Sequence, residues 1–224
     1  MARLIARSPA RTATLVRRGP WLALGLTLLA VGVGSNRVFE LAPRAVVAGE
    51  WWRIFTCHLV HFSSAHAVGD IVAFAVWAGL VEAISRRLFV TVTSVAAFVV
   101  GVGVLTSCPA VRHYGGLSAL DVALATTLLC VLATSRWLRR VRGARFIIAV
   151  IAALHVSKAV YELAVGKAVL APDLGAGVTL LPAAHLFGAA AGVLGWLAWW
   201  KGASLALDSA PLGEDGHLRC GERL

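Results

Sequence analysis

The chain has 224 residues, of which 59% are hydrophobic and only 14% are charged, and its mean hydropathy is +0.81. This apolar share exceeds the roughly 45–50% of soluble domains, so the composition excludes an ordinary water-soluble globular protein and indicates a membrane protein. The net charge of +10 would suit a nucleic-acid-binding protein, but no interleaving of basic and aromatic residues supports that function, and no nucleic-acid partner is expected.

Long apolar stretches predict six membrane-spanning helices, over residues 21–36, 67–84, 88–107, 117–135, 144–165 and 179–200. About 20 helical residues cross a bilayer core of roughly 30 Å, and a helix satisfies its own backbone polar groups in lipid. The stretches do not alternate as the strands of a membrane β-barrel do. We therefore expect an all-α membrane bundle over residues 21–200, a basic N-terminal segment over 1–20 and a polar tail over 201–224.

The first apolar stretch follows several arginines, an order that is also typical of a secretory signal peptide. No convincing small-residue cleavage site precedes a soluble domain, and more apolar stretches follow, so we interpret residues 21–36 as the first span. The connection over residues 37–66 is the longest on its side and contains Trp51 and Trp52. Such amphipathic aromatic residues favour a segment that lies partly in the membrane interface.

The basic residues gather on one side of the predicted spans. They cluster before residue 20, at 86–87, at 136–145 and after 200, whereas the opposite side contains Arg37, Arg44, Arg53, Arg112 and Lys167. Cytoplasmic segments of membrane proteins carry the excess of lysine and arginine, so we expect both termini in the cytoplasm. The same residues can bind acidic lipid head groups, which makes the bilayer itself a partner.

Ser118 follows Gly115 and Gly116 and stands at the start of the predicted span over 117–135. Glycine lets the backbone turn sharply and approach a substrate closely. A serine at a helix start lies beside unpaired backbone N–H groups that can stabilise an oxyanion. Serine is also a common helix N-cap, so the motif alone favours a structural role.

His185 stands near the start of the last predicted span, and Gly188 and Gly192 follow it. The four-residue spacing places small residues on one helix face, which allows close approach of another helix, here the one that starts at Ser118. A histidine held in this way can act as the base for a serine hydroxyl. The alternative is a buried histidine bonded to a backbone carbonyl. Ionisable residues inside a membrane are functional candidates, so the pair predicts peptide-bond hydrolysis within the membrane.

From about residue 49 to residue 200 the chain resembles the rhomboid family of intramembrane serine proteases. The similarity is found in residues 49–56, in His61, His66 and Asp70, in residues 79–82, in Gly116-Leu117-Ser118 and in Ala184-His185-x-x-Gly188-x-x-x-Gly192. The resemblance implies a catalytic dyad of Ser118 and His185 with no acidic third residue and no cofactor. It also implies that His66 and the Ser118 backbone N–H bind the oxyanion, with Gly116 and Asp70 in support.

Two residues depart from the family pattern. Ala119 stands where a glycine usually follows the nucleophile, and Asp70 stands where the family has asparagine. An ionised carboxylate would repel an oxyanion, so Asp70 is expected to be protonated, turned away or paired with a cation, and burial would favour the neutral form. With Lys158 and Glu162, these features resemble the rhombosortase branch. That branch is implied to trim Gly-Gly-type C-terminal sorting tails from exported, membrane-anchored proteins at the bacterial inner membrane.

Other polar residues have competing interpretations. His155, Lys158 and Glu162 share one helix face, where the lysine and glutamate are expected to neutralise each other or to recognise a substrate tail. The same two alternatives, structural or substrate-tail contact, apply to Arg53 and Glu82 in the family motifs. The histidines at 58, 61 and 66 lack the pattern of a catalytic zinc site, so no metal is expected.

Cys57 and Cys108 are the two cysteines assigned to the outer, oxidising side, so a disulfide between them is predicted.

Two other functions compete with proteolysis. A catalytically silent rhomboid-like protein would bind membrane clients, but such members lack the serine or the histidine, and both are present here. A transporter or channel would need a polar path that continues to the inner side of the membrane, whereas the polar residues lie mostly in the outer half.

Overall fold

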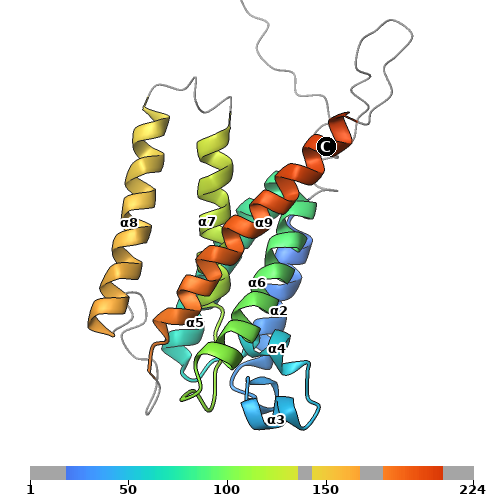
Figure 1. Ribbon diagram of the computed structural model, residues 1–224, viewed down its shortest axis with the longest axis vertical. Helices are drawn as coiled ribbons and strands as arrows, with labels where there is room; N and C mark the ends of the chain where they lie inside the picture. Colours follow the sequence, from blue (N-terminus) through green and yellow to red (C-terminus); the bar gives the residue numbers. More distant parts are fainter. Residues whose placement is uncertain (1–18, 136–142, 167–178, 209–224) are drawn as a thin grey trace, which may run out of the picture.

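The computed structural model describes residues 19–135, 143–166 and 179–208, and long helices dominate this part of the chain (Figure 1). These helices are α2 (Trp21–Val33), α5 (Ser64–Ile84), α6 (Arg86–Ser107), α7 (Ser118–Thr134), α8 (Ala144–Val165) and α9 (Pro182–Asp208). Each coincides with one predicted apolar stretch. Helix α9 continues past residue 200 to Asp208, while its apolar, membrane-length part ends at Lys201. The segments 1–18 and 209–224 lie outside the described residues.

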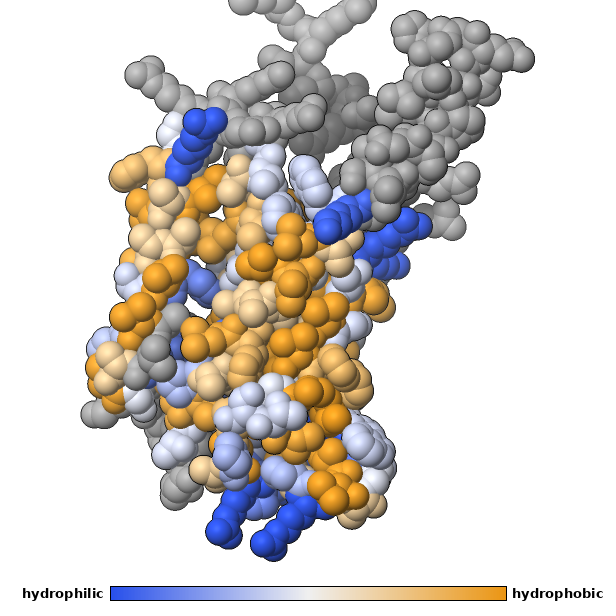
Figure 2. Space-filling model, viewed as in Figure 1, coloured by the Kyte–Doolittle hydropathy of each residue, from blue (hydrophilic) through white to orange (hydrophobic). Residues whose placement is uncertain are grey.

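The described helices give the molecule the surface of a membrane protein. Three of them are long and apolar enough to cross a bilayer: α5, α6 and the Pro182–Lys201 part of α9. Helices α2 and α7 are shorter apolar helices. Figure 2 shows a hydrophobic belt between hydrophilic ends of the molecule. Length and composition thus support three of the six predicted spans, and the full count stays a prediction.

Helix α7 lies at the centre of the bundle, in contact with α5, α6, α8 and α9. Its sequence is apolar on almost every side, and Ala123 and Leu124 are completely buried. A helix that is hydrophobic all round is expected to be enclosed by others. The consequence for function is that the start of α7, with Ser118, is held inside the bundle.

Helices α7 and α9 approach each other closely along a line of glycines. A Cβ atom at Gly188 would collide with the carbonyl oxygen of Ala119, and one at Gly192 would collide with that of Ala123. The Thr127 hydroxyl on α7 also donates to the Gly192 carbonyl at 3.0 Å. Small residues permit this backbone contact, which fixes the depth of α9 relative to α7.

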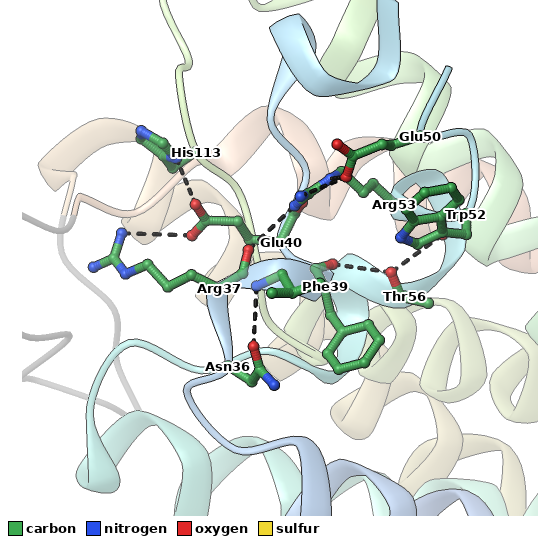
Figure 3. Close-up of polar contacts among 10 residues, drawn as sticks. Asn36, Arg37, Phe39, Glu40, Glu50, Trp52, Arg53, Thr56 and His113 are labelled. Carbon is green, nitrogen blue, oxygen red and sulfur yellow. Dashed lines mark hydrogen bonds and ion pairs between the residues drawn. The ribbon is translucent and has the colours of Figure 1, made fainter. Parts of the chain in front are cut away.

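The connection between α2 and α5 is built from short helices: η1 (Arg37–Phe39), α3 (Pro43–Val47), α4 (Arg53–Thr56) and η2 (Cys57–Leu59). The buried Arg53 holds it together, because its Nε donates to Glu50 Oε2 at 2.7 Å and its Nη1 donates to the Arg37 and Glu40 carbonyls at 3.1 and 2.9 Å (Figure 3). These contacts give Arg53 a structural role.

A pair of backbone hydrogen bonds joins this connection to the segment before Ser118. Leu41 N donates to the Tyr114 carbonyl at 2.9 Å, and Tyr114 N donates to the Leu41 carbonyl at 3.0 Å. The carboxylate of Glu40 lies next to this pair, and its Oε1 is 2.6 Å from His113 Nδ1 (Figure 3). The α2–α5 connection therefore restrains the segment of chain that leads to the start of α7.

Glu82 has a structural role at the other end of α5. Its carboxylate accepts from Leu22 N at 3.3 Å and Ala23 N at 2.7 Å, and Arg86 Nε donates to it at 3.1 Å. The first N–H groups of a helix lack intrahelical partners, and a carboxylate there also suits the helix dipole. Glu82 thus fastens the start of α2 to the end of α5.

The predicted disulfide is not formed. Cys57 and Cys108 are both free thiols, and Cys57 Sγ donates to the Ile54 carbonyl at 3.5 Å. Burial raises the pKa of the Cys57 thiol well above its ordinary value. A thiol that stays protonated is a poor partner for disulfide exchange, so Cys57 acts as a small buried apolar residue.

Candidate active site

The hydroxyl of Ser118 is paired with the imidazole of His185. Ser118 is the first residue of α7, and Leu117 occupies the N-cap position without a capping hydrogen bond from its own side chain. The Ser118 Oγ lies 3.0 Å from His185 Nε2, and the His185 side chain is buried in the first turn of α9. The distance is within hydrogen-bond reach, as proton transfer between a nucleophile and its base requires. Ser118 is therefore not the N-cap of α7. His185 Nε2 contacts a side-chain hydroxyl and not a backbone carbonyl.

Gly116 makes the turn that leads to Ser118. Its φ of +125° is unfavourable for residues with a side chain. A Cβ atom there would lie 3.1 Å from His66 Cε1 and 3.3 Å from Asp70 Oδ2. Glycine at this position therefore lets the backbone pass close to His66 and Asp70 on its way into α7.

Asp70 contacts both groups that the family resemblance assigns to oxyanion binding, namely the Ser118 backbone N–H and the His66 ring. Its Oδ2 accepts from Ser118 N at 3.1 Å and lies 3.1 Å from His66 Nε2. His61 Nε2 lies 3.5 Å from the same oxygen. The carboxyl group is not turned away, because its Oδ2 faces the start of α7 and the rings of His61 and His66. Asp70 acts here as an acceptor held between two histidines and the start of α7.

The three histidines of the α2–α5 connection and α5 do not converge on one point. His61 and His66 lie edge to face, with ring centroids 5.3 Å apart, beside Asp70. His58 instead places Nε2 3.0 Å from the Ala97 carbonyl on α6. Burial lowers the pKa of His58 to about 4, so its ring is neutral at pH 7 and can donate to that carbonyl. His58 anchors η2 to α6.

An acidic residue contacts the other ring nitrogen of His185, which neither the sequence nor the family resemblance predicted. His185 Nδ1 lies 3.0 Å from Glu162 Oε2 in the last turns of α8. Lys158 Nζ lies 2.7 Å from Glu162 Oε1 and 2.8 Å from Oε2. The shared face of Lys158 and Glu162 was visible in their spacing, but the spacing did not show that this face turns toward α9.

A cleft of about 450 Å³ opens at the paired serine and histidine. Ser118, His185 and His66 line it, and Arg37, Arg112 and His113 add basic groups from the α2–α5 connection and from the segment before α7. The cleft is large enough for a few residues of an extended peptide and is of the size usual for ligand sites.

Comparison with known protein families identifies one match in this chain. A family model described as Rhomboid domain matches residues 48–201, a range that contains every residue of the cleft from α5, α7 and α9 named above. No curated protein matches the chain.

Proposed function

Because the chain belongs to the rhomboid family, whose members are generally intramembrane serine peptidases, we propose that it cleaves membrane-anchored proteins with Ser118 as nucleophile and His185 as general base. The observation that carries this proposal is the 3.0 Å contact between Ser118 Oγ and His185 Nε2 in the cleft. A silent client-binding protein or a transporter would not need this pairing.

In the proposed reaction, His185 Nε2 takes the proton of the Ser118 hydroxyl while Oγ attacks the carbonyl carbon of the scissile bond. The resulting tetrahedral intermediate collapses as His185 gives the proton to the leaving amine, which leaves an acyl group on Ser118. A water molecule, deprotonated by the same imidazole, then attacks the acyl carbon and releases the carboxylate product. One nitrogen thus serves as base and acid in turn.

The oxyanion of this intermediate requires donors close to Ser118. The backbone N–H of Ser118 and the ring of His66 are the proposed donors, and both now contact Asp70 Oδ2. Preorganised donors at the developing charge are a major source of catalysis. We therefore expect Asp70 to release them when the substrate carbonyl enters the cleft.

The proposed substrates are proteins with a C-terminal membrane anchor, and the finer proposal is a Gly-Gly-type sorting tail. Support comes from the cleft at the ends of α7 and α9 and from the resemblance to the rhombosortase branch. Residues without side chains leave the scissile backbone accessible to a nucleophile held between helices. The proposed setting is the bacterial inner membrane, with both termini in the cytoplasm and the cleft on the outer side.

Reconstitution in liposomes with a fluorogenic transmembrane substrate tests the activity. Wild-type protein should cleave the substrate, whereas Ser118→Ala and His185→Ala should each abolish cleavage while circular dichroism and melting temperature stay near wild type. Because the two residues act as one unit, the double variant should be no worse than either single variant. Turnover by folded Ser118→Ala protein would contradict the assignment.

The branch assignment has a separate test. A substrate that carries Gly-Gly before its anchor should be cleaved at that pair, and a matched substrate with Leu-Leu in its place should not. Equal cleavage of both substrates would still support the protease function but would rule out a preference for Gly-Gly.

A further inference from the structure

Three residues at the ends of three helices form one line of contacts. Ser118 begins α7, His185 lies in the first turn of α9, and Glu162 lies in the last turns of α8. The Ser118 Oγ is 3.0 Å from His185 Nε2, and His185 Nδ1 is 3.0 Å from Glu162 Oε2. Helix α8 runs opposite to α7 and α9, so its end lies beside their starts (Figure 1).

We propose that Glu162 is the acidic positioning residue of a Ser118–His185–Glu162 triad; this inference rests on the proposed protease function. The carboxylate accepts the Nδ1–H of His185, which leaves Nε2 unprotonated and aimed at the serine hydroxyl. It also stabilises the imidazolium that forms when His185 takes the serine proton. The dyad implied by the family resemblance is thereby extended with a third residue from α8.

The environment of Glu162 fits this role. Glu162 is only 1% exposed, so its contact with His185 is shielded from solvent and is not readily replaced by water. Lys158 binds both carboxylate oxygens, at 2.7 and 2.8 Å, and fixes the orientation of the carboxylate plane. Oε2 then faces His185 while Lys158 balances the negative charge within the membrane.

The competing explanation is that Lys158 and Glu162 only neutralise each other and that His185 touches the pair by proximity. The two explanations differ when both charges are removed together. Removal of one partner of a buried ion pair leaves an uncompensated charge, whereas removal of both is often neutral or stabilising. If neutralisation were the only role, the charge-free double variant would work normally.

The test uses the reconstituted full-length protein and the fluorogenic transmembrane substrate, with kcat and KM measured separately. Glu162→Gln should lower kcat by about 10²- to 10⁴-fold, by analogy with the loss of the aspartate in serine-protease triads, with KM within about threefold. Lys158→Met/Glu162→Gln should stay as impaired as Glu162→Gln. Glu162→Asp, which retains a carboxylate, should recover part of kcat.

Glu82→Gln is the matched control, because Glu82 is also a buried glutamate paired with a cation four residues away, here Arg86. It should lower the melting temperature and leave kcat unchanged. If Glu162→Gln does not fold, the double variant carries the test, since it contains no unpaired buried charge. A double variant with kcat within about threefold of wild type, or a folded Glu162→Gln protein with unchanged kcat, would overturn the triad.

A second readout separates this inference from the proposed function. The rate at which a fluorophosphonate modifies Ser118 depends on His185 as base but not on the peptide substrate. Glu162→Gln and the double variant should both slow this modification by at least about tenfold relative to wild type and Glu82→Gln. Absence of any cleavage by wild type would reject the protease function, while an unchanged modification rate would reject the role of Glu162 alone.

Discussion

At the residue scale, Asp70 holds two groups that the proposed reaction needs. Its Oδ2 accepts from Ser118 N at 3.1 Å and lies 3.1 Å from His66 Nε2. This carboxylate oxygen lies where the oxyanion of the proposed intermediate would bind, because it contacts the same two donors. The contact organises the start of α7 around these donors, and it opposes a second negative charge there.

Asp70→Asn should therefore keep at least the wild-type kcat. The amide oxygen can still accept from Ser118 N, and the site loses a group that could repel the oxyanion. The measurement is kcat and KM on the transmembrane substrate, with Asp70→Ala as the control that removes the acceptor and leaves His66 without its partner. A folded Asp70→Asn protein with a kcat more than about tenfold below wild type would show that the carboxylate itself is required.

At the element scale, the position of His185 depends on how closely α9 packs on α7. The glycines at 188 and 192 bring the α9 backbone against the carbonyls of Ala119 and Ala123. His185 precedes Gly188 by one turn, so any displacement of α9 at that glycine changes the distance to Ser118 Oγ. A shift of about 1 Å in a catalytic geometry can cost about 10² in rate.

Gly188→Ala should lower both activity and stability. Its methyl group would collide with the Ala119 carbonyl, and overpacking of this kind costs about 1–3 kcal/mol of unfolding free energy. We expect kcat to fall by about tenfold or more, together with a lower melting temperature in detergent.

Gly25→Ala is the control, because nothing lies within 4 Å of a Cβ atom at Gly25 in α2. It should keep wild-type kcat and a melting temperature at or above wild type, since alanine favours a helix over glycine. Equal effects of the two substitutions would show that the α7–α9 contact does not set the site geometry.

Helix α8 joins the site through a polar face. His155 Nε2 lies 3.4 Å from the Thr126 hydroxyl of α7, and Glu162 contacts His185 of α9. The opposite side of α8 exposes Phe146, Val156 and Val160, as expected for a face toward lipid. Polar side chains in membranes turn toward the protein interior, so these contacts determine the rotation of α8 about its axis.

At the scale of the whole molecule, the sequence predicted the positions of the helices well. The apolar stretches coincide with α2 and α5 to α9 because the hydrophobic length required by a bilayer is a local property of the chain. The apolar part of α9 ends at Lys201, close to the predicted residue 200, but the helix itself continues to Asp208. Helix ends depend on backbone contacts that composition does not reveal.

The pairing of side chains was only partly predictable. Glycine spacing suggested that α7 and α9 approach each other, and the structure brings Ser118 and His185 together there. The spacing of Lys158 and Glu162 defined a helix face but not the neighbour that it meets, so the contact with His185 was missed. The disulfide was wrong for a related reason, because the sequence does not show the direction of the Cys57 thiol, which donates to the Ile54 carbonyl.

The central claim, that Ser118 is a nucleophile activated by His185, is tested most directly by active-site modification. Wild-type protein in liposomes is treated with a fluorophosphonate, and the modified peptide is identified by mass spectrometry. We predict one adduct, on Ser118, which is absent in Ser118→Ala and forms at least about 10²-fold more slowly in His185→Ala. Modification of a different residue, or an unchanged rate in His185→Ala, would contradict the claim.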